Sequence, residues 1–375
     1  MLSALAAGIA APAWIDTLAG RATGGLLRSY DVDGGTPFDR THGNCAYVYD
    51  NAVVGFALLR AGRPAQARVI GDALLAAQAR DRFYRDGRLR NAYAAGRVAA
   101  TGDYPLPGWY DNAQGTWVED IYHVSSATAV VAWAMLFWCA LSRATGDARY
   151  AVAAGRAGDW VARMTRTTQG FSGGFLGWEP SPAPVGWAST EHNFDLSLAF
   201  AALGRSDLAA HAADFVRARW DAAEGRFCSG LTPDGAVNRH SAADANLWPL
   251  LAPGAPQAWW AALDWVVARH GVPAGAPQGI DFDTDRDGIW LEGTAYLALA
   301  ARRAGRAALA DTAMATLRAQ TAPGGLVYAS SVPRLTTGLA TGLTAEADFY
   351  YYRRPHIAAT GWAAMALAGT DPFSG

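Results

Sequence analysis

Six stretches of the chain place acidic, histidine and aromatic side chains directly before an apolar run. The clearest is residues 287–296, DGIWLEGTAY, in which Trp290 and Glu292 precede the run LALAARRAG. The other five begin at Tyr47, Thr116, Ser189, Ser241 and Arg353. Each apolar run predicts a buried helix, so the polar residues would lie in its first turn. If the six helices pack side by side and parallel, their first turns form one polar, aromatic floor, and we expect the function there.

Seven acidic residues occupy these predicted first turns, and hydrolysis of a glycoside requires two carboxyl groups. The seven are Asp50, Glu119, Asp120, Glu191, Asp195, Asp244 and Glu292. One carboxyl group protonates the leaving oxygen while the other activates water or attacks the sugar. Glu292 is a candidate acid because Trp290 predicts apolar surroundings, which raise a carboxyl pKa. Glu191 is the other candidate acid, and Asp50 or Asp120 on a facing helix is the candidate base of an inverting reaction.

Helix capping explains the same carboxylates without any chemistry. Asp and Glu in a first turn are favoured by the helix dipole and by hydrogen bonds to free backbone N–H groups. Asp50 and Asp244 fit this structural role well, whereas Glu191 and Glu292 fit either role. So many acids at equivalent positions on buried helices exceed what capping requires, and this convergence favours a catalytic role for some of them.

Aromatic and polar residues near the same helix starts are candidates for sugar binding, because a Trp or Tyr ring stacks on a pyranose face. The predicted substrate-binding residues are Trp117, Glu119, His192, Asp195, Trp248, Trp290, Tyr352, Arg353 and His356. Further aromatic residues at helix starts or in loops are Trp109, Tyr110, Trp178, Trp187 and Tyr351. Trp133, Trp138 and Trp362 lie inside apolar runs, so we expect these three to fill the core.

The acidic loop before Trp290 resembles a calcium-binding loop. Its alternating aspartates, followed by Gly288, are Asp283, Asp285 and Asp287. The pattern then departs from a calcium loop, because position twelve, where a bidentate Glu is required, is Thr294. We therefore expect no metal or other cofactor, and an acidic turn that orients Trp290 and Glu292. Calcium bound by the three aspartates is the alternative.

About twelve helices are predicted, and they alternate between two kinds. One kind carries Arg, Asp and Gln on one face, as in residues 62–81. The other is apolar nearly all round, as in residues 50–59, which predicts a helix buried on every side. An inner ring of about six buried helices inside an outer ring of about six amphipathic helices accounts for the alternation. A solenoid is the rival architecture, but its spacers would not need such polar helix starts.

Three helix pairs resemble those of (α/α)6-toroid carbohydrate-active enzymes, also called six-hairpin glycosidases. They read YDNAVVGFALLRAG, ATGDARYAVAAGRAGDWV and WLEGTAYLALAARRAGR. The class includes inverting glycoside hydrolases, polysaccharide lyases and sugar epimerases, and the resemblance covers nearly the whole chain without selecting one family. It implies an all-α (α/α)6 toroid with short β-hairpins in the loops. It also implies a carbohydrate substrate.

Three functions are compatible with these residues. The first is a glycoside hydrolase that cleaves a polysaccharide or oligosaccharide with the acids named above. The second is a polysaccharide lyase or sugar epimerase that uses Tyr352, Arg353 and His356, because Arg pairs with a uronate carboxylate and Tyr or His moves a proton. In an epimerase, His192 and His356 would supply the acid and base. The third is a glycan-binding or interaction scaffold without catalysis.

Composition excludes other classes. The formal net charge of −2 and the lack of a basic run argue against nucleic-acid binding. No apolar run is long enough to predict an integral membrane segment. Residues 1–13 resemble either the remnant of a signal peptide or the first turns of a helix. We expect residues 14–375 to form one catalytic domain, in a periplasmic or secreted protein, with a cytoplasmic location as the alternative.

Overall fold

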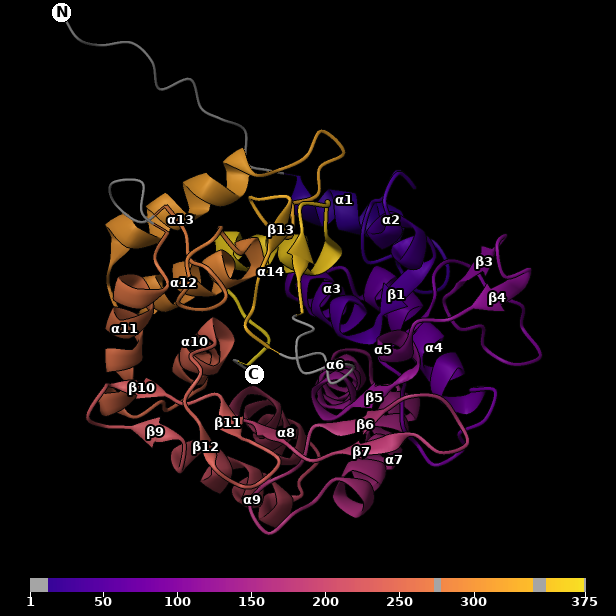
Figure 1. Cartoon of the computed structure of the whole chain (residues 1–375), viewed down its shortest axis with the longest axis horizontal. Helices are drawn as coiled ribbons and strands as arrows, with labels where there is room; N and C mark the ends of the chain where they lie inside the picture. The colour runs from indigo at the N-terminus through magenta and orange to yellow at the C-terminus, as the bar shows by residue number, and fades with distance from the viewer. Residues whose placement is uncertain (1–12, 273–277, 340–348, 374–375) are drawn as a thin grey trace, which may run out of the picture.

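The computed structural model describes residues 13–272, 278–339 and 349–373, in which twelve helices form two concentric rings (Figure 1). The inner ring consists of α3 (Val48–Arg60), α6 (Thr128–Thr145), α8 (Thr190–Ala202), α10 (Ala243–Leu251), α12 (Leu291–Arg303) and α14 (Ile357–Ala368). The outer ring consists of α1 (Trp14–Arg21), α4 (Pro64–Ala79), α7 (Ala148–Met164), α9 (Ser206–Arg217), α11 (Ala261–Arg269) and α13 (Ala307–Ala319). Helix α14 packs against α3 and closes the inner ring. The predicted (α/α)6 toroid is confirmed.

The two kinds of helix predicted from the sequence occupy the two rings. In α6 almost every residue from Thr128 to Leu141 is buried, whereas α7 buries only the stripe from Tyr150 to Val161 that faces inward. Trp133, Trp138 and Trp362 lie fully in the core, as predicted. The inner helices approach closely, since a Cβ atom on Gly55 of α3 would lie 2.3 Å from the Phe137 ring of α6.

Short antiparallel sheets lie in the connections between the helices, where short β-hairpins were predicted. They comprise β1 (Cys45–Tyr47) with β2 (Ala92–Ala94), β3 (Trp109–Asp111) with β4 (Thr116–Val118), β9 (Trp220–Asp221) with β10 (Arg226–Phe227), and β13 (Arg334–Leu335) with β14 (Tyr351–Tyr352). Two three-stranded sheets comprise β5 (Ser126–Ala127), β6 (Gly174–Leu176) and β7 (Ala183–Val185), and β8 (Ala188–Ser189), β11 (Gly230–Leu231) and β12 (Val237–Asn238). Three short helical segments, α2 (Pro37–His42), α5 (Ile121–Val124) and η1 (Gln257–Trp260), complete the connections.

A repeated hydrogen-bond pattern fixes the start of five inner helices. The fourth residue after the N-cap is Asn or Thr, and its side chain bonds the backbone of the segment that follows the preceding outer helix. These residues are Asn51, Asn193, Asn246, Thr294 and Thr360. At the sixth start, Asn91 accepts a bond of 2.7 Å from the N–H of Ala127, the N-cap of α6. The first turns of the inner helices are thereby held in place.

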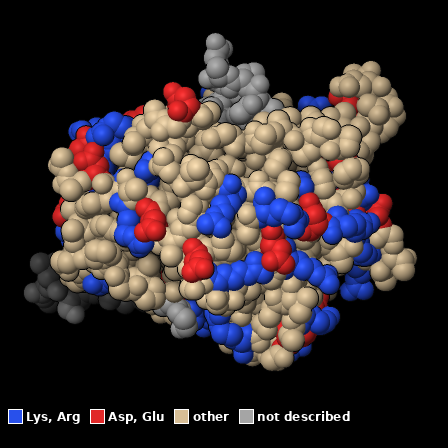
Figure 2. All heavy atoms as spheres, turned by 90° about the horizontal axis from the view of Figure 1, so that it is seen from below, with Lys and Arg blue, Asp and Glu red and all other residues tan. Residues whose placement is uncertain are grey.

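The surface and the N-terminus bear on two further expectations. Basic and acidic side chains are interspersed on the face shown in Figure 2, in keeping with ion pairs such as Arg217 with Asp214 on α9. Within the described chain, α6 alone has the length and apolarity to cross a membrane, and it lies buried in the inner ring. Residues 1–12 of the predicted signal-peptide remnant lie outside the described residues.

Candidate active site

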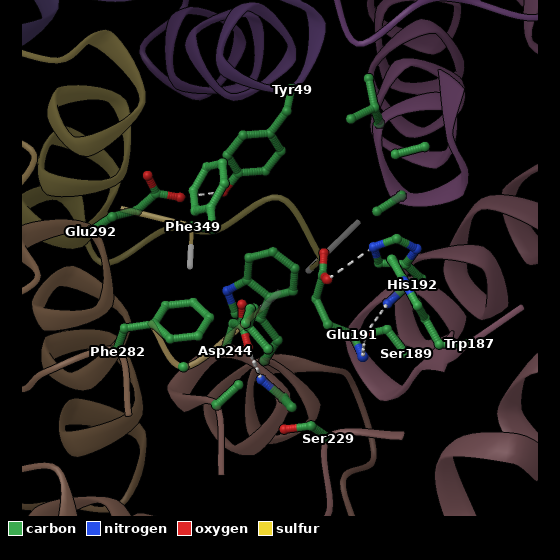
Figure 3. A pocket seen from close by; sticks show the side chains of 18 of the residues that line it. Tyr49, Trp187, Ser189, Glu191, His192, Ser229, Asp244, Phe282, Glu292 and Phe349 are labelled. Carbon is green, nitrogen blue, oxygen red and sulfur yellow. Dashed lines mark hydrogen bonds and ion pairs between the residues drawn. The ribbon is translucent and has the colours of Figure 1, made fainter. Parts of the chain in front are cut away.

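A cavity of about 840 Å³ opens where the inner helices begin. Every inner helix lends residues from its N-cap or first turns to the wall, and the loops between the helices supply the rest. The lining residues that the sequence analysis named as candidates are Asp50, Trp187, Glu191, His192, Asp244, Trp248, Trp290, Glu292, Tyr351 and His356. Figure 3 shows Glu292 and Tyr49 on one side of the cavity, with Glu191 and His192 on another. The carboxyl groups here are buried beneath aromatic side chains, and such burial raises the pKa of a carboxyl group.

Glu292 is a buried carboxyl group with one oxygen engaged and one free. The hydroxyl groups of Tyr49 and Tyr296 both donate hydrogen bonds to Oε1. Oε2 has no hydrogen-bond partner among the described residues. Burial raises the pKa of Glu292 to about 7, although nearby His356 and the two tyrosine hydrogen bonds lower it in part. Glu292 is therefore about half protonated at neutral pH.

His356, the N-cap of α14, forms an ion pair with Asp50 beside Glu292. Its Nε2 lies 3.0 Å from Oδ2 of Asp50, and its Nδ1 lies 3.9 Å from Oε2 of Glu292. The ring of Tyr30 stacks on the imidazole with 4.3 Å between centroids. Burial lowers the pKa of His356, but the charge and hydrogen bond of Asp50, together with the charge of Glu292, outweigh burial and the net pKa is raised. A cation is thus held against the Glu292 carboxyl group.

A second group of carboxyl groups lies on α8 and α10. Ser189 caps α8 by accepting from the N–H groups of Glu191 and His192, so the Glu191 side chain does not cap the helix, and its Oε2 lies 3.5 Å from Nε2 of His192. Burial, and then the charge of Asp244, raise the pKa of Glu191 well above its usual range. Burial raises the pKa of Asp244 to about 6. Burial and the charge of Asp244 thus both favour the protonated form of Glu191.

The aromatic part of the wall contains polar edges that have no protein partner. Its aromatic residues include Tyr122, Trp187, Trp248, Phe282, Trp290, Phe349 and Tyr351. The indole Nε1 atoms of Trp248 and Trp290, and Nδ1 of His192 and His356, are buried without a hydrogen-bond partner among the described residues. These atoms are buried behind the wall, whereas the aromatic rings of the wall suit the apolar faces of sugar rings.

Four predicted site residues near α5 and α8 do not line the cavity. Asp120 is the N-cap of α5, where Oδ1 accepts from the N–H groups of Tyr122 and His123 at 2.8 and 3.1 Å. Glu119 forms a bidentate pair with Arg82 on the outside of the loop, and Trp117 is half exposed on β4. Asp195 is buried beneath the floor, where its Oδ2 accepts from Nε1 of Trp133 at 3.0 Å. For Asp120, capping explains the residue, as the alternative interpretation proposed.

Tyr352 and Arg353 also lie away from the cavity. The Tyr352 ring packs against Phe38 with 4.3 Å between centroids, and Nη1 of Arg353 donates to Gln320 Oε1 at 2.7 Å. The neighbouring Tyr351 lines the cavity instead. Successive side chains of a strand point to opposite faces, and the run of three tyrosines does not show which one points inward.

Sequence reasoning missed several lining residues. Asp244, one of the seven candidate acids, was expected to fit the capping role well; its side chain lines the cavity and accepts from the N–H of the adjacent Ala245. Tyr296 was overlooked although it follows Glu292 by four residues, the spacing that places two side chains on one helix face. A search for tyrosines one helical turn from each acid would have found Tyr296. Tyr49 contacts Glu292 from a distant helix, and no local spacing indicates that contact.

The acidic loop brings together a different set of aspartates from the one predicted. Oxygen atoms of Asp281, Asp283 and Asp285 lie within 4.8 Å of one another, while Asp287 bonds Thr336. Oδ2 of Asp283 lies 3.3 Å from Nε2 of His240. The expectation of no metal, and calcium as its alternative, both stay predictions; the three clustered aspartates include Asp281 where the alternative named Asp287.

Comparison with known proteins shows the fold. No family model and no curated protein matches the chain. Among solved structures, an alpha-amylase from Clostridium perfringens is similar, with a TM-score of 0.65, 9% identity and 96% of each chain covered. A glycosidase variant in complex with glucose has a TM-score of 0.63 and 15% identity, with 95% of this chain and 97% of that one covered. Cellobiose 2-epimerase from Bacillus thermoamylovorans has a TM-score of 0.63 and 10% identity, with 94% and 95% covered. The chain therefore has the (α/α)6 fold of these carbohydrate-active enzymes along nearly its whole length.

Proposed function

We propose that the chain is a carbohydrate-active enzyme, and specifically a glycoside hydrolase that acts on an oligosaccharide or polysaccharide. The observation that carries the proposal is the pair of carboxyl centres in one aromatic cavity, Glu292 on one side and Glu191 with Asp244 on the other (Figure 3). Each centre holds a carboxyl group whose pKa is raised by burial. Glycoside hydrolysis needs one protonated and one ionised carboxyl group across the scissile bond.

Glu292 has the properties of the general acid. Its Oε1 accepts two tyrosine hydroxyl groups, so the proton of the neutral acid belongs on the unpartnered Oε2. A pKa of about 7 keeps a substantial fraction protonated at neutral pH. In the proposed reaction, Oε2 gives this proton to the glycosidic oxygen as the bond to the anomeric carbon breaks.

Asp244 and Glu191 together would supply the base. Asp244, with a pKa of about 6, is largely ionised at neutral pH, whereas burial and the Asp244 charge favour the protonated form of Glu191. The carboxylate takes a proton from a water molecule whose oxygen attacks the anomeric carbon, and inversion follows because the water arrives opposite the leaving group. These assignments replace Asp50 and Asp120 as bases, since Asp50 is paired with His356 and Asp120 caps α5.

The charge of the cavity favours a neutral glycan. No arginine or lysine is found among the described residues that line it. A lyase needs a cation for the uronate carboxylate, and Arg353 is engaged elsewhere with Gln320 and Ser331. A lyase centred on Tyr352 and Arg353 therefore has no support from this geometry.

A panel of neutral polysaccharides and oligosaccharides tests the proposal. We expect new reducing ends without ultraviolet absorbance, and the first-formed anomer, followed by NMR, should be inverted. Glu292→Gln should lower kcat at least 1,000-fold, since it removes the proton donor. Asp120→Asn is the matched control, because Asp120 lies outside the cavity and Asn also caps helices. Binding of a glycan without turnover by the wild-type protein would instead indicate a glycan-binding scaffold.

A sugar epimerase is the second candidate, and the two histidines favour it. Asp50 keeps His356 positively charged, whereas burial lowers the pKa of His192 to about 3 and leaves it neutral. One charged and one neutral imidazole in a single cavity provide an acid and a base for removing and replacing a proton next to a carbonyl group. Incubation of cellobiose in D2O distinguishes the two candidates. Deuterium at C2 without new reducing ends would mean epimerisation.

A further inference from the structure

Three exposed aromatic residues outside the cavity neighbour, along the chain, the members of one ion-pair network. The exposed fractions are 51% for Phe83, 50% for Trp117 and 43% for Trp178. Each ring lies within two residues of a member of a single ion-pair network, formed by Arg82, Glu119 and Glu179. Large exposed aromatic residues are unusual on a folded chain, and a group of them marks a binding surface.

The ion pairs hold the three loops that carry these rings. Nη1 and Nη2 of Arg82 donate to the two oxygens of Glu119 at 2.5 and 2.8 Å, and its Nε donates to Glu179. Glu179 also accepts from Nη1 of the fully buried Arg90 at 2.9 Å, and Arg90 is in turn paired with Asp81. The segment after α4, the end of β4 and the loop between β6 and β7 are therefore tied to one buried anchor.

The β3–β4 hairpin fixes the orientation of Trp117. Trp117 lies opposite Tyr110, which is 58% exposed, in the strand register. A Cβ atom on Gly108 would lie 2.6 Å from Nε1 of Trp117, so glycine is what lets the indole lie against the hairpin. A ring held in this way loses little entropy when a ligand stacks on it.

Two of these loops continue into the cavity wall. Five residues after Trp117 the chain reaches Tyr122, and nine residues after Trp178 it reaches Trp187. Both Tyr122 and Trp187 line the cavity. Two of the exposed rings thus lie on the same segments of chain as two aromatic residues of the cavity wall.

We propose that Phe83, Trp117 and Trp178 bind the part of a glycan chain that extends beyond the cavity, so that the preferred substrate is a polysaccharide or long oligosaccharide. This inference rests on the proposed function. The apolar faces of successive sugar rings stack on the aromatic side chains, and their hydroxyl groups bond Glu119, Glu179 and the partly exposed Arg82. Flat rings beside fixed charges match the alternation of apolar face and polar edge in a sugar.

The test compares long and short substrates of the same linkage. Amylose and hydroxyethylcellulose are the polymers, and maltose and cellobiose are their short counterparts. In Trp117→Ala and Trp178→Ala we expect kcat/KM to fall about 3- to 10-fold for the polymer, as for one lost stacking contact. It should stay unchanged for the disaccharide. Trp117→Phe should restore much of the loss, and Met164→Ala, which removes an exposed apolar side chain from the end of α7, is the control.

The outcomes separate this inference from the proposed function. An equal loss on long and short substrates, or no loss on either, overturns the inference and leaves the hydrolase intact. If no substrate is turned over, the proposed function fails, and gel retardation of wild-type protein by the two polymers takes over as the readout. Retardation that Trp117→Ala weakens supports the surface. Retardation that it leaves unchanged, or no retardation, overturns the surface. Equal thermal unfolding of all variants excludes misfolding.

Discussion

His356 and Asp50 form a buried ion pair, with 3.0 Å between Nε2 and Oδ2, across the junction of the last inner helix and the first. Both side chains are almost fully buried. The pair lies against Glu292, whose Oε2 is 3.9 Å from Nδ1 of the imidazole. Closure of the ring and protonation of the proposed catalytic acid are therefore linked through one imidazole.

Asp50→Asn should lower the stability of the fold and raise the pKa of Glu292. Without the carboxylate, burial lowers the pKa of His356 and the ring becomes neutral at pH 7. The His356 cation lowers the pKa of Glu292, and the Asp50 charge raises it more weakly. Loss of both charges should therefore raise the pKa of Glu292. The alkaline limb of the pH profile of kcat/KM should move to higher pH. Unfolding in urea should show a loss of about 3–5 kcal/mol, as for breaking one partner of a buried pair. An unmoved limb would contradict the link.

Tyr49→Phe should raise the pKa of Glu292 by a separate route. The Tyr49 hydroxyl donates to Oε1 of Glu292, and this bond favours the ionised form. Its removal should move the alkaline limb of kcat/KM to higher pH, and Tyr296→Phe should act in the same direction. Thermal unfolding serves as the control, because Nε1 of Trp362 also loses its acceptor in Tyr49→Phe. A limb that moved to lower pH would show that the hydroxyl does not stabilise the carboxylate.

The wild-type pH profile should be bell-shaped and narrow. The proposed base, Asp244, has a pKa of about 6 and must be ionised, so kcat/KM should fall below about pH 6. The proposed acid, Glu292, has a pKa of about 7 and must be protonated, so activity should fall above about pH 7. Asp244→Asn should abolish most activity, whereas loss of only the acidic limb would mean that Glu191 replaces it. A flat profile from pH 5 to 8 would exclude both assignments.

Glu292 should also make the fold less stable at alkaline pH. Its pKa in the fold, about 7, lies above the ordinary value of 4.5, so the folded chain binds this proton more tightly than the unfolded chain does. The associated stability is complete below pH 4.5 and is lost as pH rises through 7. Each pKa unit corresponds to about 1.4 kcal/mol, so the loss is on the order of 3 kcal/mol. Relative to wild type, Glu292→Gln should therefore gain stability between pH 5 and pH 8 in urea unfolding. A difference that is constant with pH would contradict this.

Much of the fold could be predicted because the positions of the apolar residues around a helix indicate which of its faces are buried. The run from Thr128 to Leu141 is apolar on every side, and such a helix must be surrounded by others. The stripe from Tyr150 to Val161 is apolar on one side only, so α7 must face solvent. Because the two kinds of helix alternate along the chain, an inner ring of buried helices inside an outer ring of amphipathic helices is a simple way to pack them.

The site could be predicted only in part, because the choice between capping and chemistry depends on the neighbouring side chains. Asp120 and Asp244 both stand at helix starts and both accept from a backbone N–H of their own turn, yet of the two only Asp244 lines the cavity. Ser189 takes over the capping of α8, so Glu191 does not cap the helix. Such differences follow from contacts between segments far apart in the sequence, such as Tyr49 with Glu292, and no local pattern contains them.

Asn246→Ala tests whether the repeated Asn and Thr bonds position the acids. The Asn246 side chain accepts from the Phe227 N–H at 2.8 Å. It also donates to the carbonyl of Ala242 at 2.9 Å, and Ala242 lies two residues before Asp244. Removal leaves the buried Phe227 N–H unpaired, so we expect a loss of about 2–3 kcal/mol in urea unfolding. We also expect kcat to fall about 10-fold with little change in KM, because the first turn of α10 is no longer fixed against β10. Asn112→Ala, at an exposed turn, is the control and should change neither quantity. A loss of stability with unchanged kcat would show that the bond supports the fold without positioning Asp244.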